Sequence, residues 1–147
     1  MKTNQALVVR IGGRGAPLAG KSDSNHWVPM DTSDAGGGFE AANSPMELVL
    51  IALGGCTSMD VLSILAKKRI RLDDYEVELE GDRSETVPKV FTAIRVVFHF
   101  YGENLRSEDL EQAVRLSEEK YCSVAAMLRP SVPISVRFEA YPPRPAH

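Results

Sequence analysis

Cysteine and histidine are scarce in this sequence, and their scarcity excludes two classes of small protein. The 147 residues include two cysteines, Cys56 and Cys122, and three histidines. Two cysteines cannot build a disulfide scaffold, and the sequence contains neither a CxxC pair nor a zinc-ligand spacing. From the count alone, the simplest interpretation is two buried thiols that act as small hydrophobic side chains.

An excess of basic residues is also lacking. The formal net charge is −3 and the isoelectric point is about 5.6, which disfavours nucleic-acid binding. The longest uninterrupted apolar run, residues 48–56, is too short to span a bilayer. The N-terminal stretch MKTNQALVVRIGG has one lysine and alternating apolar residues, so we interpret it as a first strand and not as a signal peptide. We therefore expect a cytoplasmic protein with no nucleic-acid or membrane partner.

The composition is that of one soluble globular domain. Hydrophobic residues make up 44% of the chain and charged residues 25%. A chain of this length can bury one core, so we predict a single domain over residues 1–147. The proline-rich end, about 141–147, is expected to be a loose tail.

Alternating apolar residues predict five strands, at 5–11, 26–31, 75–83, 90–101 and 134–140. Pro29 cannot donate to a β-ladder, so the second strand is expected at an edge. The segments GGRGAPLAG and TSDAGGGFEAAN are interpreted as a turn and a flexible loop. Pro88 lies between the third and fourth strands, where we expect the turn of an antiparallel hairpin.

Two helices are predicted. The first spans residues 45–69, because Ser44, Pro45 and Glu47 form an N-cap, a first helical residue and a capping box. The second begins at Ser107 and stops before Pro130; the positions of its expected apolar stripe are Leu110, Val114, Ser117, Tyr121, Val124 and Leu128. The order of elements predicts an α+β fold in which both helices pack on antiparallel sheet.

The first helix is unusually apolar. Residues 48–56 are apolar all round, which implies burial on every side. One small sheet and one other helix would struggle to cover it, so we predict a homodimer with this helix near the interface.

Gly54 and Gly55 stand directly before Cys56, within this helix. Each glycine costs about 1 kcal/mol relative to alanine in a helix interior. Close helix packing or an open wall beside the thiol would each explain the pair. If the two helices cross, Cys56 and Cys122 could meet as a reactive thiol and a resolving thiol.

The segments SPMELVLIALGGCTSMDVLSILAKKR and LSEEKYCSVAAML resemble the family of osmotically inducible protein C and organic hydroperoxide resistance proteins (OsmC/Ohr), in a less characterised branch. The resemblance implies an OsmC-like fold in which two chains intertwine, with active sites at the dimer interface. It also implies a thiol peroxidase that acts on organic hydroperoxides and is recycled by a dithiol or lipoyl-type reductant. No cofactor or metal is implied.

Carried onto this chain, the resemblance makes Cys56 the peroxidatic thiol and Cys122 the resolving thiol. It makes Arg14, in the turn GGRG, the residue that activates the thiolate, with Arg10 as the other nearby choice. The family's glutamate lies ten residues before the peroxidatic cysteine, and that position holds Met46 here. Glu47 is half a helical turn off the direction of Cys56, and capping explains it.

Asp60 and His99 are two further candidates near the expected chemistry. Asp60 follows Cys56 by one helical turn, and a carboxylate there would raise a thiol's pKa. His99 could assist, although a lone histidine on a strand is more often structural.

Two alternatives to a peroxidase remain. The same fold could bind a small hydrophobic ligand with weak or no peroxidase activity, or both thiols could be inert core residues. The distance between the Cys56 and Cys122 sulfurs separates these hypotheses, because a redox pair must come within disulfide reach.

Overall fold

A computed structural model describes residues 3–11, 15 and 17–144. The chain divides into two compact units, residues 1–49 and 50–147. Helix α1 (Pro45–Lys67) begins in the first unit and continues into the second.

The first unit contains a three-stranded sheet of order β1-β2-β3, formed by β1 (Ala6–Arg10), β2 (Leu18–Ser22) and β3 (Val28–Met30). Both pairs are antiparallel. Strand β3 lies at an edge, as Pro29 predicts. Strand β2 corrects the sequence analysis, which assigned part of it to a turn because of the glycines in GGRGAPLAG. A Cβ at Gly20 would lie 3.1 Å from Met30 Cε, so the glycine makes room for the side chain of the neighbouring strand.

Asp31 organises the loop that follows β3, which contains the short helix η1 (Asp34–Gly36). The residue is 3% exposed, and its carboxylate accepts hydrogen bonds from the backbone N–H groups of Thr32, Phe39 and Ala41 at 2.8, 3.0 and 3.1 Å. Burial acts to raise the pKa of Asp31, but the three donors outweigh it and the pKa lies below its usual value. The loop is therefore tied to one carboxylate.

Helix α1 starts with the predicted capping box. The Ser44 N–H donates to Glu47 Oε2 at 2.6 Å, and the Glu47 N–H donates to Ser44 Oγ at 3.3 Å. By length and composition α1 is apolar enough to cross a membrane, which the longest uninterrupted apolar run did not indicate. One face of the helix belongs to the core, since Leu53, Val61 and Leu65 are at most 1% exposed.

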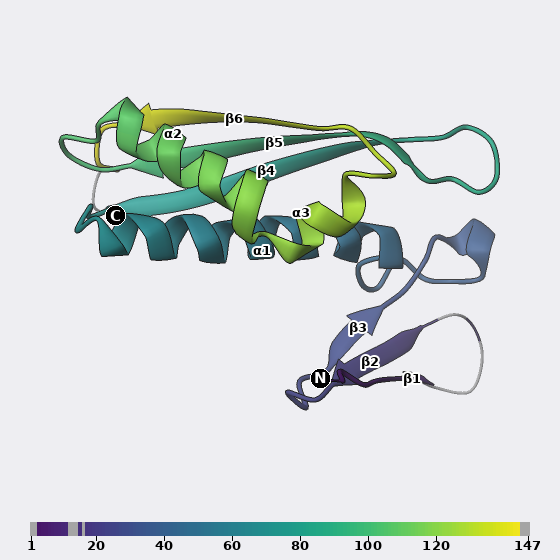
Figure 1. The fold of residues 1–147 in the computed structure, drawn as a ribbon. Coiled ribbons are helices and arrows are strands. Elements are labelled where there is room, and N and C mark those ends of the chain that lie inside the picture. Colours follow the sequence, from purple (N-terminus) through teal and green to yellow (C-terminus); the bar gives the residue numbers. More distant parts are fainter. Residues whose placement is uncertain (1–2, 12–14, 16, 145–147) are drawn as a thin grey trace. The chain divides into compact units, whose positions relative to one another are not determined.

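The second unit contains a sheet of order β4-β5-β6, formed by β4 (Asp74–Arg83), β5 (Phe91–Tyr101) and β6 (Ile134–Tyr141). Strands β4 and β5 form the expected antiparallel hairpin. Strand β6 pairs with β5 in parallel, which corrects the expectation of purely antiparallel sheet. The helices between β5 and β6 carry the chain back to the same end of the sheet, so the two strands must run in one direction (Figure 1).

The helices of this unit cover one face of the sheet (Figure 1). Alternate residues of β5 are buried on that face, among them Phe98 and Phe100 at no more than 1% exposure. The Tyr75 ring of β4 packs beside both phenylalanines, and its hydroxyl donates to Ser58 Oγ of α1 at 2.8 Å. This bond fixes the middle of α1 on the sheet.

The second predicted helix is interrupted. It consists of α2 (Ser107–Leu116), the π-helical turn η2 (Ser117–Tyr121) and α3 (Ser123–Leu128). The expectation of one continuous apolar stripe is wrong at Tyr121, which is 48% exposed, whereas Cys122 is 3% exposed. The wider π-turn rotates the following residues, so that Cys122 takes the inward direction instead of Tyr121.

The two glycines of α1 have different surroundings. A Cβ at Gly54 would lie 2.6 Å from Leu79 Cδ1 of β4, so this glycine permits close packing of helix on sheet. A Cβ at Gly55 would meet no described atom within 4 Å. Of the two explanations for the glycine pair, close packing applies to Gly54 and open space to Gly55.

Asp109 joins α2 to the end of α1. Its carboxylate, within a residue that is 9% exposed, accepts from Arg106 Nε and from Lys68 Nζ, both at 2.8 Å. The hydrogen bonds from Arg106 and then Lys68 lower the pKa of Asp109 to about 2. The ion pair with Lys68 fixes α2 against α1.

We predict that Gly54→Ala lowers the free energy of unfolding, because the new methyl group meets the Leu79 side chain. Overpacking typically costs about 1–3 kcal/mol. The better helix propensity of alanine offsets about 1 kcal/mol of this cost. Urea denaturation measures the change. In a double-mutant cycle, Gly54→Ala should cost less in a Leu79→Ala background. Equal costs in both backgrounds would contradict the contact.

We predict that Asp109→Asn lowers the thermal midpoint at neutral pH, because it removes the ion pair between α1 and α2. The folded pKa of about 2 lies below the unfolded value of 3.8. The stabilisation is therefore complete above the unfolded value and is lost as the pH falls toward the folded one. Circular dichroism melts should show the difference between wild type and variant shrinking over this range. Glu108→Gln, next in sequence, is the control, and a difference independent of pH would contradict the assignment.

Candidate active site

The structure brings Cys56 and Cys122 together. The two sulfurs and one carboxylate oxygen of Asp60 all lie within 4.8 Å of one another. Both cysteines are free thiols; Cys56 is partly exposed and Cys122 is buried. We call Cys56, Asp60 and Cys122 the thiol cluster. The two sulfurs are at most 4.8 Å apart, whereas a disulfide bond is about 2.05 Å long. The side chains must therefore move closer together before they can form a disulfide.

The turn of α1 that carries Cys56 is held by its neighbours. The buried Thr57 hydroxyl bonds to the carbonyl oxygens of Leu53 and Gly54, at 3.0 and 3.1 Å. The Ser58 hydroxyl donates to the Gly54 carbonyl at 2.6 Å and also accepts from Tyr75. These bonds fix the position of Cys56 relative to the sheet.

Cys122 lies at the junction of η2 and α3. Its N–H donates to the Ser117 carbonyl at 2.9 Å, which closes the π-helical turn. Its backbone is extended, with φ −69° and ψ 103°, and its sulfur accepts the Ala125 N–H at 3.4 Å. Cys122 is thus the N-cap of α3, and its thiol direction is set by the backbone on both sides.

Ser117 connects the two helices at the cluster. Its side chain is fully buried, and its hydroxyl bonds to Asp60 Oδ2 at 3.2 Å and lies 3.4 Å from the Thr57 carbonyl oxygen. The same residue therefore holds Asp60 by its side chain and Cys122 by its carbonyl.

The electrostatics of the cluster favour a neutral Cys122. Burial raises the pKa of the Cys122 thiol, and the neighbouring Cys56 sulfur and Asp60 carboxylate raise it further. The Ala125 N–H acts in the opposite direction but does not outweigh them. Ionisation of the Cys122 thiol is therefore disfavoured in the folded protein.

Three donor atoms this close could also share a thiophilic cation. Such a cation would require both thiols to ionise. Structural sites for such cations usually take four protein ligands, and the described residues supply three here, so we assign no ion to the cluster.

Of the other predicted site residues in the N-terminal part of the chain, the structure describes Arg10 and Glu47. Arg14 falls outside the described residues, and its role stays a prediction. Arg10 is an exposed residue of β1. Glu47 is occupied by the capping box, and its bond from the Ser44 N–H lowers its pKa.

His99 belongs to the sheet face opposite the helices. Its Nδ1 lies 3.0 Å from the Tyr141 hydroxyl, and the two rings stack. The neighbouring residues Phe98 and Phe100 point to the helix side, so the alternation of the strand directs His99 away from Cys56. The structural interpretation of His99 fits this position.

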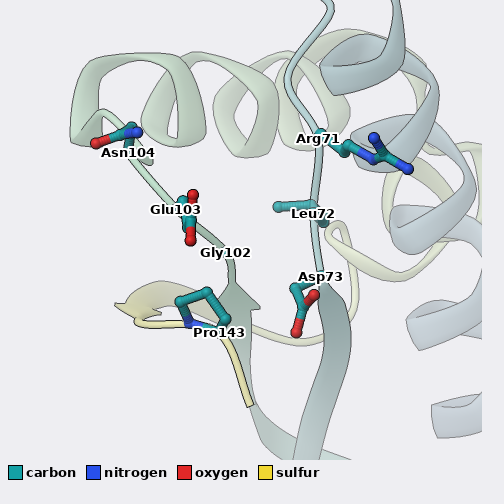
Figure 2. Close-up of a pocket in the computed structure, with 7 residues that line it drawn as sticks. All are labelled: Arg71, Leu72, Asp73, Gly102, Glu103, Asn104 and Pro143. Carbon is teal, nitrogen blue, oxygen red and sulfur yellow. The ribbon is translucent and has the colours of Figure 1, made fainter. Parts of the chain in front are cut away.

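A hollow of about 400 Å³ lies at another end of the second unit, between the segment before β4, the segment after β5 and Pro143 (Figure 2). Arg71, Asp73 and Glu103 supply its charged side chains. Neither cysteine lines it, so it is separate from the thiol cluster.

Ser117 and the π-turn were missed by the sequence analysis. For Ser117 the available signal was its place as a serine inside an otherwise apolar stripe, at a position expected to face the core. A buried hydroxyl needs a partner, and that requirement indicates a polar group across from it.

Comparison with known proteins places these observations in a family. The model of the OsmC-like protein family matches residues 36–137. Protein YhfA of Escherichia coli K12 is 44% identical over 125 residues, covering 85% of this chain and 90% of that protein.

Solved structures extend the likeness. A hypothetical protein from Aquifex aeolicus VF5 has 31% identity and a TM-score of 0.84, covering 98% of this chain and 100% of that one. The organic hydroperoxide resistance protein OhrB of Bacillus subtilis has 17% identity and a TM-score of 0.63, covering 92% of this chain and 98% of that one, which shows the fold alone.

Proposed function

Because this chain belongs to the OsmC-like protein family, we propose that it is a thiol peroxidase that reduces organic hydroperoxides with Cys56 and Cys122 as its redox pair. The observation that carries the proposal is the approach of two free thiols to within 4.8 Å, at the junction of two helices. Structural relatives named for organic hydroperoxide resistance support the substrate class.

The first step uses Cys56, which is the more exposed thiol. Its thiolate attacks the terminal oxygen of the hydroperoxide, and the O–O bond breaks. Cys56 becomes a sulfenic acid, while the alkoxide leaves and is protonated to an alcohol. The greater exposure of Cys56 and the raised pKa of the buried Cys122 thiol support this division of roles.

The second step uses Cys122. Its sulfur attacks the sulfenic sulfur of Cys56, which forms a disulfide and releases water. An external dithiol, such as a lipoyl-type reductant, then restores both thiols by exchange. The cycle needs no bound cofactor, since the electrons come from the dithiol, and such reductants suit a cytoplasmic location.

We predict that the wild-type protein consumes cumene hydroperoxide in the presence of dithiothreitol and that Cys56→Ser abolishes the activity. Removal of a nucleophile should lower the rate by about 100-fold or more. A ferrous-oxidation assay of residual peroxide measures the consumption. Addition of EDTA should leave the wild-type rate unchanged.

Cys122→Ser is the matched control for this experiment. Without dithiothreitol it should react once, and its Cys56 sulfenic acid should be trapped by dimedone and detected by intact mass. Equal peroxide consumption by wild type and Cys56→Ser would contradict the proposal. Native mass spectrometry that finds a retained apolar ligand on an inactive protein would instead favour the hydrophobic-ligand hypothesis.

We also propose that the functional form is a homodimer. Ile51, Met59 and Leu62 are 54%, 76% and 39% exposed, and together with Gly55 they follow one face of α1. This apolar stripe lies beside Cys56, and the open space at Gly55 lies within it. A second copy of the chain would cover the stripe and complete the surroundings of the thiol.

We predict that the protein has twice the chain mass of 16.1 kDa in solution, and that Met59→Lys shifts it to the monomer. A charge in a buried apolar interface is not compensated, which is the reason for the shift. Size-exclusion chromatography with light scattering measures the mass. Met127→Lys is the matched control, because Met127 of α3 is 79% exposed and lies off the stripe. A wild-type monomer at micromolar concentration would contradict the dimer.

A further inference from the structure

The disulfide-closing step poses a problem of proton transfer. Cys122 is 3% exposed, so its thiol has no direct path for releasing a proton to bulk water. Burial, followed by the Cys56 sulfur and the Asp60 charge, also raises the pKa of this thiol. A neutral thiol is a poor nucleophile, and hydroxide is a poor leaving group from the sulfenic sulfur. Closure therefore benefits from a group that removes one proton and supplies another.

We propose that Asp60 is the acid–base residue of this step, which rests on the proposed peroxidase function. Its carboxylate takes the proton of the Cys122 thiol and delivers it to the hydroxide that leaves Cys56. The carboxylate oxygen lies within 4.8 Å of both sulfurs, so one group reaches the donor and the acceptor of the proton. Asp60 is thereby a catalytic residue of the second step. It does not take the place of the glutamate that is absent at Met46.

Position and orientation of Asp60 are both set by the fold. It follows Cys56 by one turn of α1, so the two side chains share a helix face. The Ser117 hydroxyl donates to Asp60 Oδ2 at 3.2 Å, while the Ser117 carbonyl holds the N–H of Cys122. The base and the thiol are thus held by the same buried residue.

Asp60 also has access to solvent that Cys122 lacks. It lines a hollow of about 300 Å³ between α1 and η2, through which the product water can leave. Among the described residues, the titratable groups that border Asp60 are those of the cluster and those around this hollow: Cys56, Cys122, Lys67, Lys68 and Tyr121. Lys68 is already paired with Asp109.

The step balances without a further reactant. The Cys122 S–H bond breaks and its proton passes to the Asp60 carboxylate. The Cys122 sulfur forms the S–S bond as the S–O bond of the Cys56 sulfenic acid breaks, so the sulfenic sulfur is reduced and the Cys122 sulfur is oxidised. The leaving hydroxide takes the proton from Asp60 and becomes water, and Asp60 returns to the carboxylate.

Asp60→Asn tests the proposal, because asparagine can still accept the Ser117 hydrogen bond but cannot shuttle the proton. Reduced protein is mixed with one equivalent of cumene hydroperoxide, and rapid-quench samples are analysed by dimedone trapping and intact mass. Sulfenic acid should form at least as fast as in wild type, since Asp60 has no part in the attack of Cys56 on the peroxide. Disulfide closure should slow by about 100-fold, so that the sulfenic acid accumulates.

A pH profile separates proton transfer from a merely structural role. In Asp60→Asn the closure rate should rise by about tenfold per pH unit as long as the Cys122 thiol is mostly protonated, because hydroxide then ionises the thiol. The wild-type rate should rise less steeply. Glu119→Gln, an exposed charge of the same π-turn, is the control and should close at the wild-type rate.

The outcomes distinguish this proposal from the proposed function. If wild type forms no sulfenic acid and no disulfide, both are overturned. If wild type completes the cycle and Asp60→Asn closes at the same rate, Asp60 alone is overturned. If Asp60→Asn does not fold, the wild-type closure rate is compared in H₂O and D₂O; slower closure in D₂O supports proton transfer in the step, and equal or faster closure overturns it.

Discussion

The π-helical turn at Ser117–Tyr121 is the constraint on which the thiol cluster depends. In a regular α-helix, residue 122 would lie about 140° around the axis from residue 117. The N–H of Cys122 instead bonds to the carbonyl five residues earlier, at 2.9 Å, and this aligns Cys122 with Ser117. One widened turn therefore places the buried thiol and the buried hydroxyl on the same side, facing α1.

That placement is useful only because α1 is itself fixed. Gly54 allows the helix to approach Leu79, and the bond from Tyr75 to Ser58 holds the next turn on the sheet. At the far end, the ion pair between Lys68 and Asp109 holds α2 in place. These contacts lie on both sides of Cys56 along the helix, so the position of the thiol is determined by packing on the sheet and on α2 together.

Local patterns made much of this fold predictable from sequence. The capping box at Ser44 and Glu47, the hairpin of β4 and β5, and the meeting of the two cysteines all follow from signals within a few residues or from helices on one sheet face. Strand β2 was missed because the glycines in GGRGAPLAG indicated a turn, and only the neighbouring Met30 explains Gly20. The direction of β6 was missed because it depends on the path of the helices before it.

The candidate site was less predictable for a related reason. The residues 117–121 carry no local signal for a π-turn, and their exact rotation is stabilised by contacts of Ser117 with Asp60 and Thr57 across the helix interface. Without that rotation, Tyr121 would continue the apolar stripe and Cys122 would point elsewhere. The proximity of the thiols could therefore be expected from the sequence, but their orientation could not.

Asp60 looked unfavourable in sequence, because a carboxylate near a thiol opposes ionisation. The structure shows that this opposition acts on the buried Cys122, whose pKa burial already raises. In the proposed cycle such an asymmetry is useful, since it keeps the resolving thiol protonated while Cys56 reacts with peroxide. Once Cys56 is a sulfenic acid, the same carboxylate, within 4.8 Å of the Cys122 sulfur, can accept the Cys122 proton. The Asp60 carboxylate thus opposes ionisation of Cys122 before the peroxide reacts and accepts the Cys122 proton afterwards.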